Sequence, residues 1–200
     1  MDDIYQTIAT ECTGIFKDKG SKFLAFAYPV KSETEVKDIL SRLRKEHHSA
    51  RHHCYAWRMG TETIQFRSND DGEPSSTAGK PILGQLLSSN VTNTLIVVVR
   101  YFGGTLLGVS GLINAYRNAA ADALANAIIV QKTIEKHCLL HFSYNEMSDV
   151  MNLIKQEDLT VVNTRFEEKC ELTFSVRKND LLRITESFNK IYGVKLSTAD

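Results

Sequence analysis

The sequence contains no long apolar run. Its longest ones, residues 23–28 and 95–99, have the length of β-strands, whereas a membrane-spanning helix needs about 20 apolar residues. The N-terminal residues MDDIYQTIATEC are acidic where a secretory signal is basic, and they have no apolar stretch. We therefore expect a cytoplasmic protein that does not associate with a membrane.

Paired cysteines are also missing. None of the four cysteines belongs to a C-x-x-C pair: they are Cys12, Cys54, Cys138 and Cys170. Without a secretory signal, isolated cysteines indicate reduced thiols in a cytosolic protein rather than a disulfide framework.

Net charge is absent as well. The chain has 24 Lys and Arg against 24 Asp and Glu, and its formal net charge is zero. Residues 1–134 carry a surplus of two positive charges, and residues 135–200 a surplus of two negative ones. Strong non-specific binding to nucleic acid normally needs several cationic side chains on one face. Composition therefore excludes a polybasic nucleic-acid binder, although it allows a local basic patch.

The first part of the chain alternates strand and helix patterns. Strands are predicted at residues 5–16, 21–29, 53–59, 63–67 and 94–99. Helices are predicted after Ser32 as N-cap, from about Gly79, and after Ser110 as N-cap. Because residues 94–99 are apolar on both faces, we expect this strand in the centre of a covered sheet.

The rest of the chain has a different order. Strands at 134–144, 160–167, 171–177 and 194–196 alternate with helices at 146–156 and 180–190. This β-α-β-β-α-β order is that of the ferredoxin-like motif. We therefore predict an α+β protein of two domains, residues 1–132 with a mixed α/β sheet and residues 133–200 with a ferredoxin-like fold.

Two loops can carry function, an acidic one at residues 70–80 and a glycine-rich one at residues 100–111. The glycine-rich loop, RYFGGTLLGVSG, joins a buried strand to a helix. Its glycines and the helix start suit a phosphate or a carboxylate, but the same glycines also suit a plain tight turn. Both interpretations stay open at this point.

The first loop, DDGEPSSTAGK at residues 70–80, is acidic. Asp70, Asp71 and Glu73 are oxygen ligands of the kind that magnesium prefers, but turn and cap preferences favour an acidic turn ahead of a helix. Because of this loop, a metal-assisted enzyme acting on a phosphorylated or peptide substrate, with the Asp70–Glu73 and Arg100–Gly104 loops, remains the alternative to a binding protein.

Histidines cluster just ahead of Cys54 at positions 47, 48, 52 and 53. His48 and His52 have H-x-x-x-H spacing, which aligns two zinc ligands only on a continuous helix. The predicted helix ends near His48, where a histidine is favoured as a cation close to the helix C-terminus. We therefore assign no metal ligand, no cofactor and no catalytic residue.

The same loops carry a family pattern. The stretches HHCYAWRMG (residues 52–60), NDDGEPSSTAGKPIL (69–83), NTLIVVVRYFGGTLLGVSGLINAYRNAA (93–120) and SKFLA (21–25) closely resemble the IMPACT family. The resemblance covers about residues 15–125, and the remainder is similar to the small C-terminal domain of the bacterial members. The family commonly has glycine where this chain has Ser76 and Ser110.

The resemblance implies a binding protein in translation. Bacterial members are similar to domains IV and V of elongation factor G, which implies contact with RNA, the ribosome or a translation-related protein. Eukaryotic relatives regulate translation initiation in the amino-acid-starvation response, with a separate N-terminal domain that contributes to partner binding. We predict ligand or partner binding by Asp71, Glu73, Thr77, Lys80, Arg100, Tyr101, Gly103, Gly104 and Arg117.

Overall fold

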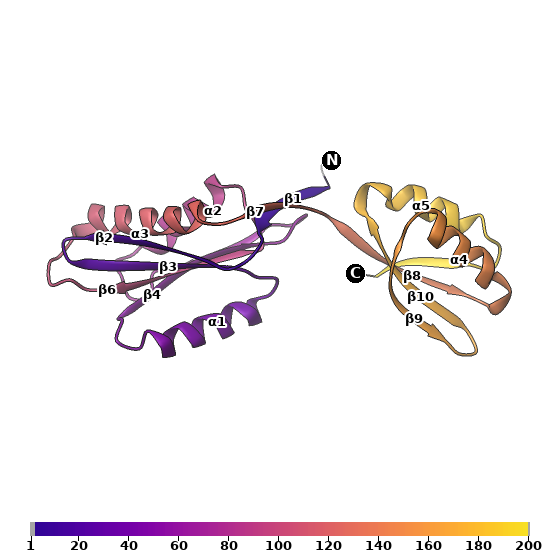
Figure 1. Ribbon diagram of the computed structural model, residues 1–200, viewed down its shortest axis with the longest axis horizontal. Helices are drawn as coiled ribbons and strands as arrows, with labels where there is room; N and C mark the ends of the chain where they lie inside the picture. Colours follow the sequence, from indigo (N-terminus) through magenta and orange to yellow (C-terminus); the bar gives the residue numbers. More distant parts are fainter. Residues whose placement is uncertain (1–2, 200) are drawn as a thin grey trace. The chain divides into compact units, whose positions relative to one another are not determined.

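The computed structural model describes residues 3–199 and divides them into two compact units. One unit comprises residues 5–132, and the other comprises residues 133–199 together with residues 3–4. The two-domain α+β architecture predicted from the sequence is confirmed (Figure 1). In the part that the structure describes, no helix is long and apolar enough to cross a membrane.

A five-stranded sheet organises the N-terminal unit. Its strands follow the order β2 (Cys12–Asp18), β3 (Ser21–Pro29), β6 (Thr94–Tyr101), β4 (His52–Met59) and β5 (Gln65–Asn69). Each neighbouring pair is antiparallel. The strand β6 lies in the middle and is buried on both faces, as its unbroken apolar pattern predicts.

Helices cover both faces of this sheet. The helices α2 (Gly79–Ser88) and α3 (Gly108–Ala125) lie on one face, and α1 (Glu33–Glu46) lies on the other (Figure 1). On the first face Phe23 and Val98 pack with Tyr116 of α3, and on the second face Trp57 packs with Leu40 of α1. Successive residues of a strand point to opposite faces of the sheet, so β3, β4 and β6 contribute alternately to the core under α2 and α3 and to the core under α1.

Local signals account for several boundaries. The Ser32 side chain accepts a hydrogen bond from the Glu35 N–H at 3.2 Å, so Ser32 caps α1 as predicted. A two-residue turn joins β2 to β3, and both of its residues have positive φ: 43° at Lys19 and 78° at Gly20. This is the mirror-image turn whose twist matches that of the flanking strands.

Other boundaries differ from the prediction. Residues 5–16 form two strands, because β1 (Ile4–Ile8) leaves the large sheet and pairs with β7 (Ile129–Thr133), a strand that the sequence did not suggest. Ser110 does not cap α3. That helix begins at Gly108, where a φ of 72° turns the chain, and its start has no side-chain cap.

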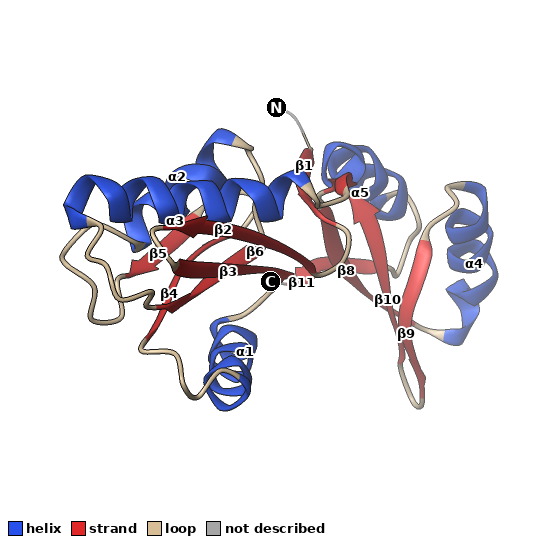
Figure 2. Cartoon of the chain, turned by 60° about the vertical axis from the view of Figure 1, so that its left-hand side comes forward, coloured by secondary structure: helices blue, strands red, loops and turns tan. Residues whose placement is uncertain are grey.

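The C-terminal unit has the predicted ferredoxin-like topology. Its elements are β8 (Glu135–Phe142), η1 (Tyr144–Glu146), α4 (Met147–Gln156), β9 (Thr160–Phe166), β10 (Cys170–Arg177), η2 (Lys178–Asp180), α5 (Leu181–Asn189) and β11 (Lys195–Ala199). The antiparallel sheet has the order β11-β8-β10-β9, which is the order of the split β-α-β motif. Val150 of α4 and Phe188 of α5 pack with Leu140 and Phe174 in one core. Figure 2 shows both helices next to the sheet of this unit.

Candidate functional site

The two predicted loops meet at a buried ion pair. Arg100, near the end of β6, donates a hydrogen bond from Nη1 to Glu73 Oε1 at 2.6 Å. The Tyr116 hydroxyl of α3 donates to the same oxygen at 2.7 Å. Burial and the neighbouring Cys54 and Glu73 raise the pKa of Tyr116 far above its ordinary value, so this hydroxyl stays protonated as a donor.

Arg100 is held from further sides. Its guanidinium lies 5.5 Å from the ring centre of Phe23 and 5.6 Å from that of Phe102. Such contacts between a cation and an aromatic face are favourable, more so away from water. Even so, Arg100 Nε is buried and has no hydrogen-bond partner. Arg100 therefore supports the loop structurally and has a buried donor, Nε, without a partner.

Asp70 organises the start of α2. Its Oδ1 accepts from the N–H groups of Ala78 and Gly79, and its Oδ2 accepts from the Ser76 N–H. Burial acts to raise the pKa of Asp70, but these backbone hydrogen bonds and the nearby Lys80 outweigh it, and the pKa is lowered. Asp70 therefore acts as an ionised cap for the orphan N–H groups of the helix start.

Asp71 ties the same loop to β4 and α1. Its carboxylate accepts from the His53 N–H at 2.7 Å and from Arg44 Nη2 at 3.0 Å, and its backbone carbonyl contacts His52 Nδ1 at 2.8 Å. With Asp70 and Glu73, all three carboxylates of the loop thus have protein donors. Within residues 3–199, no three His, Cys, Asp or Glu side chains gather to hold a metal ion. These contacts are those of an acidic turn ahead of a helix rather than of a magnesium site.

The histidine cluster is likewise dispersed. His47 Nδ1 lies 2.8 Å from the Tyr101 hydroxyl, whereas His52 and His53 alternate along β4 and therefore point to opposite faces of the sheet. The Cys54 thiol donates to the Asp70 carbonyl at 3.0 Å. Since burial raises the pKa of Cys54 well above its ordinary value, this thiol stays protonated.

The remaining predicted residues fall into separate places. Thr77 is buried and donates to the Pro74 carbonyl at 2.6 Å, while Lys80 and Arg117 are exposed on α2 and α3. Tyr101 follows Arg100 in a strand, so its side chain joins the core on the α1 face. The structure thus joins Glu73 to Arg100 and places Tyr101 on the other side of the sheet.

The glycine loop approaches the β2–β3 turn closely. A Cβ on Gly103 would lie 1.9 Å from the carbonyl carbon of Gly20, and the Gly103 N–H donates to Ser21 Oγ at 3.1 Å. A Cβ on Gly104 would meet open space, but its φ of 86° favours glycine. Gly103 is therefore required for packing, and Gly104 for the turn.

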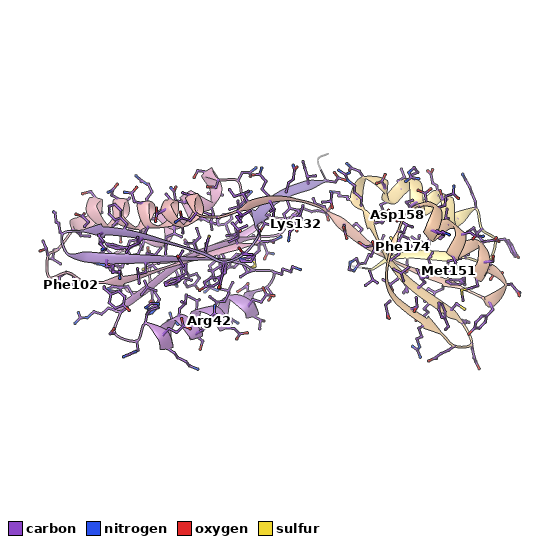
Figure 3. The ribbon with its side chains drawn as sticks, in the orientation of Figure 1. Arg42, Phe102, Lys132, Met151, Asp158 and Phe174 are labelled. Carbon is purple, nitrogen blue, oxygen red and sulfur yellow. The ribbon has the colours of Figure 1, made fainter. Side chains whose placement is uncertain are left out.

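A cavity of about 300 Å³ lies beside this ion pair, and sequence reasoning missed most of it. It is lined by Arg51, His52, Arg100, Phe102 and Leu106. Register explains the grouping, because His52 of β4 lies directly opposite Arg100 of β6. Phe102 and Leu106 are exposed by 54% and 82%, so both apolar side chains are accessible at the mouth of this cavity. Figure 3 shows Phe102 at the end of the N-terminal unit.

Two family models match this chain. The Impact N-terminal domain matches residues 19–124, and a domain of unknown function (DUF1949) matches residues 140–191. The chain is 35% identical over 161 residues to the IMPACT family member YigZ of Escherichia coli K12, covering 80% of this chain and 79% of that protein. The chain belongs to the IMPACT family.

Other relatives cover either most of the chain or about half of it. The IMPACT family member YvyE of Bacillus subtilis is 29% identical over 175 residues, covering 88% of this chain and 81% of YvyE. A crystal structure described as that of a hypothetical protein has a TM-score of 0.77 and 29% identity, covering 100% of this chain and 99% of the other. The human Protein IMPACT is 40% identical over 96 residues, which cover 46% of this chain and 29% of the human protein.

One departure from the IMPACT pattern has a structural meaning. Ser76 stands where the family commonly has glycine, and its φ is 65°. A non-glycine residue is strained in this left-handed region. The fold of the loop is kept because Asp70 accepts a hydrogen bond from the Ser76 N–H at 2.8 Å.

Proposed function

We propose that this chain is a non-catalytic protein that binds RNA or the ribosome through its N-terminal unit and acts in the regulation of translation in the cytoplasm. Membership of the IMPACT family supports the role in translation. The four unpaired cysteines support a reducing compartment. The observation that carries the binding role is a group of basic and aromatic side chains at one end of the N-terminal unit.

Three lysines gather on the β2–β3 hairpin. Lys17 and Lys22 lie directly opposite each other, Lys19 lies in the turn between them, and all three are exposed. Like charges directly opposite each other in a sheet repel. An anion bound between them relieves that repulsion, so the lysine hairpin (Lys17, Lys19 and Lys22) suits a phosphate backbone.

The hairpin also adjoins an exposed aromatic ring. Its Gly20 lies against Gly103, which directly follows Phe102. A cationic surface that follows the backbone, together with an aromatic side chain on which a base stacks, is the combination that binds single-stranded RNA. Neither feature requires a large net charge. The zero net charge of the chain is therefore compatible with a small RNA-binding surface.

A salt titration tests this proposal. Purified protein is titrated with ribosomes and with single-stranded RNA at several low salt concentrations. The three phosphates expected at the lysine hairpin contribute about −2 to the slope of log affinity against log salt. The double variant Lys17→Ser/Lys22→Ser is expected to reduce that contribution to about −0.7, because one of the three contacts at the hairpin remains.

The matched control replaces two lysines by serine outside the lysine hairpin. Lys31→Ser/Lys132→Ser removes two exposed lysines, one after the far end of β3 and one in β7. Figure 3 shows Lys132 far from Phe102. We expect this control to bind as the unmodified chain does. Absence of binding to ribosomes and RNA at tens of micromolar protein, about the weak end of non-specific affinities, would overturn the proposal in favour of a protein partner.

A further inference from the structure

The cavity beside Arg100 has the features of a ligand site that is already formed. Its five lining residues combine three basic side chains with one aromatic and one aliphatic side chain: Arg51, His52, Arg100, Phe102 and Leu106. Its volume of about 300 Å³ is at the lower end of small-ligand pockets. Mostly apolar walls with a few polar groups that fix orientation are typical of such pockets.

Two of its basic side chains are fixed in place before any ligand arrives. Arg100 is 8% exposed, is held by Glu73, and has a buried Nε without a hydrogen-bond partner. A buried donor without a partner is costly, so an acceptor at this position would be favourable. His52 Nδ1 contacts the Asp71 carbonyl, an acceptor only, so Nδ1 carries the proton and Nε2 is the free nitrogen of the ring.

The third basic side chain supplies the uncompensated charge. Arg51 is exposed and forms no ion pair with any residue from 3 to 199, whereas the charge of Arg100 is balanced by Glu73. The start of α3, two residues after Leu106, has no side-chain cap, so its free N–H groups add to the attraction for an anion. The cavity therefore favours a ligand with about one negative charge.

We propose that this cavity binds one unpaired nucleotide of an RNA chain, with the base against Phe102 and the phosphate at Arg51. This inference rests on the proposed function and specifies where a base is bound. A phosphodiester carries one negative charge, which matches the single uncompensated Arg51. A free mononucleotide carries nearly two, since the second pKa of a phosphate monoester is about 6. Phe102 provides a face for stacking, and Leu106 adds an apolar side chain to the cavity wall.

The test uses the whole chain and a labelled single-stranded hexaribonucleotide, with its duplex and a free mononucleotide as further probes. Phe102→Ala is expected to weaken single-strand binding by about 5- to 150-fold, the range of one stacked base. Arg51→Gln is expected to weaken it and to reduce the salt slope by about 0.7, which corresponds to one phosphate. The duplex is expected to bind less tightly than the single strand, because its bases are already stacked.

The control is Val109→Ala, which shortens an apolar side chain that is 59% exposed but does not line the cavity. Because Arg51 is exposed, Arg51→Gln remains informative even where Phe102→Ala alters the loop, and thermal melting distinguishes the two cases. If both variants bind RNA as Val109→Ala does, the nucleotide site is overturned, while weaker binding by Lys17→Ser/Lys22→Ser still supports the proposed function. Tighter binding of the free mononucleotide than of the hexamer would overturn the assignment to RNA.

Discussion

Arg100 and Glu73 form an ion pair whose side chains are only 8% and 3% exposed, with 2.6 Å between Nη1 and Oε1. A pair this deeply buried ties the acidic loop to the central strand. Removing either charge leaves the other one in an apolar setting, which costs more free energy than the pair itself contributes. Substitution of Arg100 is therefore expected to lower the stability of the fold, whatever effect it has on binding.

We expect Glu73→Gln to lower the free energy of unfolding by about 3–5 kcal/mol, because it leaves the buried Arg100 uncompensated. The double variant Glu73→Gln/Arg100→Met is expected to lose less than the sum of its single variants. Urea unfolding followed by circular dichroism measures both. The control is Glu33→Gln, whose 3.7 Å contact with Arg67 joins two half-exposed side chains and contributes about 0–1 kcal/mol. Additive losses in the double variant would contradict the idea of a coupled buried pair.

Substitution by alanine is expected to have opposite effects at Gly103, which contacts Gly20, and at Gly84, which faces open space. Gly103→Ala places a Cβ 1.9 Å from a backbone carbon, so the β2–β3 turn and the glycine loop must separate. We expect a loss of about 1–3 kcal/mol, the usual range for overpacking. Gly84→Ala on α2 meets no atom within 4 Å and is expected to gain up to about 1 kcal/mol through helix propensity. Equal melting temperatures for the two variants would contradict this reading of the loop.

Ser76 predicts a gain in stability. Its φ of 65° is strained for serine and open to glycine. Ser76→Gly is expected to raise the free energy of unfolding by up to about 1 kcal/mol, part of the relieved strain being offset by the greater freedom of glycine in the unfolded chain. Ser75→Gly changes the neighbouring residue, which is not in the left-handed region, and is expected to be neutral or destabilising. Thermal melting separates the two, and a loss in Ser76→Gly would contradict the strain argument.

Much of the fold could be predicted from local patterns, because apolar period and turn residues are properties of short segments. The continuous apolar stretch of β6 indicated its central place, and the order of elements after residue 134 indicated the ferredoxin-like unit. The break between β1 and β2 could not be predicted, since β1 pairs with β7, more than a hundred residues away. That pairing depends on residues distant in the chain, and nothing in residues 5–16 themselves indicates it.

The candidate site was less predictable for the same reason. The sequence identified the acidic and glycine loops as carriers of function, but the cavity depends on the register that sets His52 opposite Arg100. A shift of one residue would turn His52 to the other face. Tyr101 could have been separated from Arg100 at the outset, because adjacent residues of a strand point to opposite faces. Arg51 and Phe102 become candidate site residues only because the folded chain brings them together in the cavity wall.

A final prediction concerns acid stability and His53. This side chain is 6% exposed, and burial lowers its pKa from the ordinary value although the nearby Asp71 acts to raise it. The unfolded chain therefore binds a proton at His53 more readily than the folded chain does. By linkage, stability rises with pH wherever the unfolded state holds more protons. The contribution of a neutral His53 is complete above the unfolded pKa of about 6.5, and it is lost as the pH falls from there toward the lower folded pKa.

We expect the free energy of unfolding to be level between about pH 7 and 8 and to decline from about pH 6.5 toward pH 5. His53→Gln removes the titrating group and is expected to flatten that decline, although its stability at pH 8 can be lower because the core is repacked. His48→Gln, which changes an exposed histidine, is expected to keep the decline of the unmodified chain. The range ends at pH 5, where Asp70 still caps its helix as a carboxylate because, in spite of burial, its backbone hydrogen bonds and Lys80 lower its pKa. Urea unfolding at each pH supplies the comparison, and an undiminished decline in His53→Gln would assign the acid sensitivity to another group.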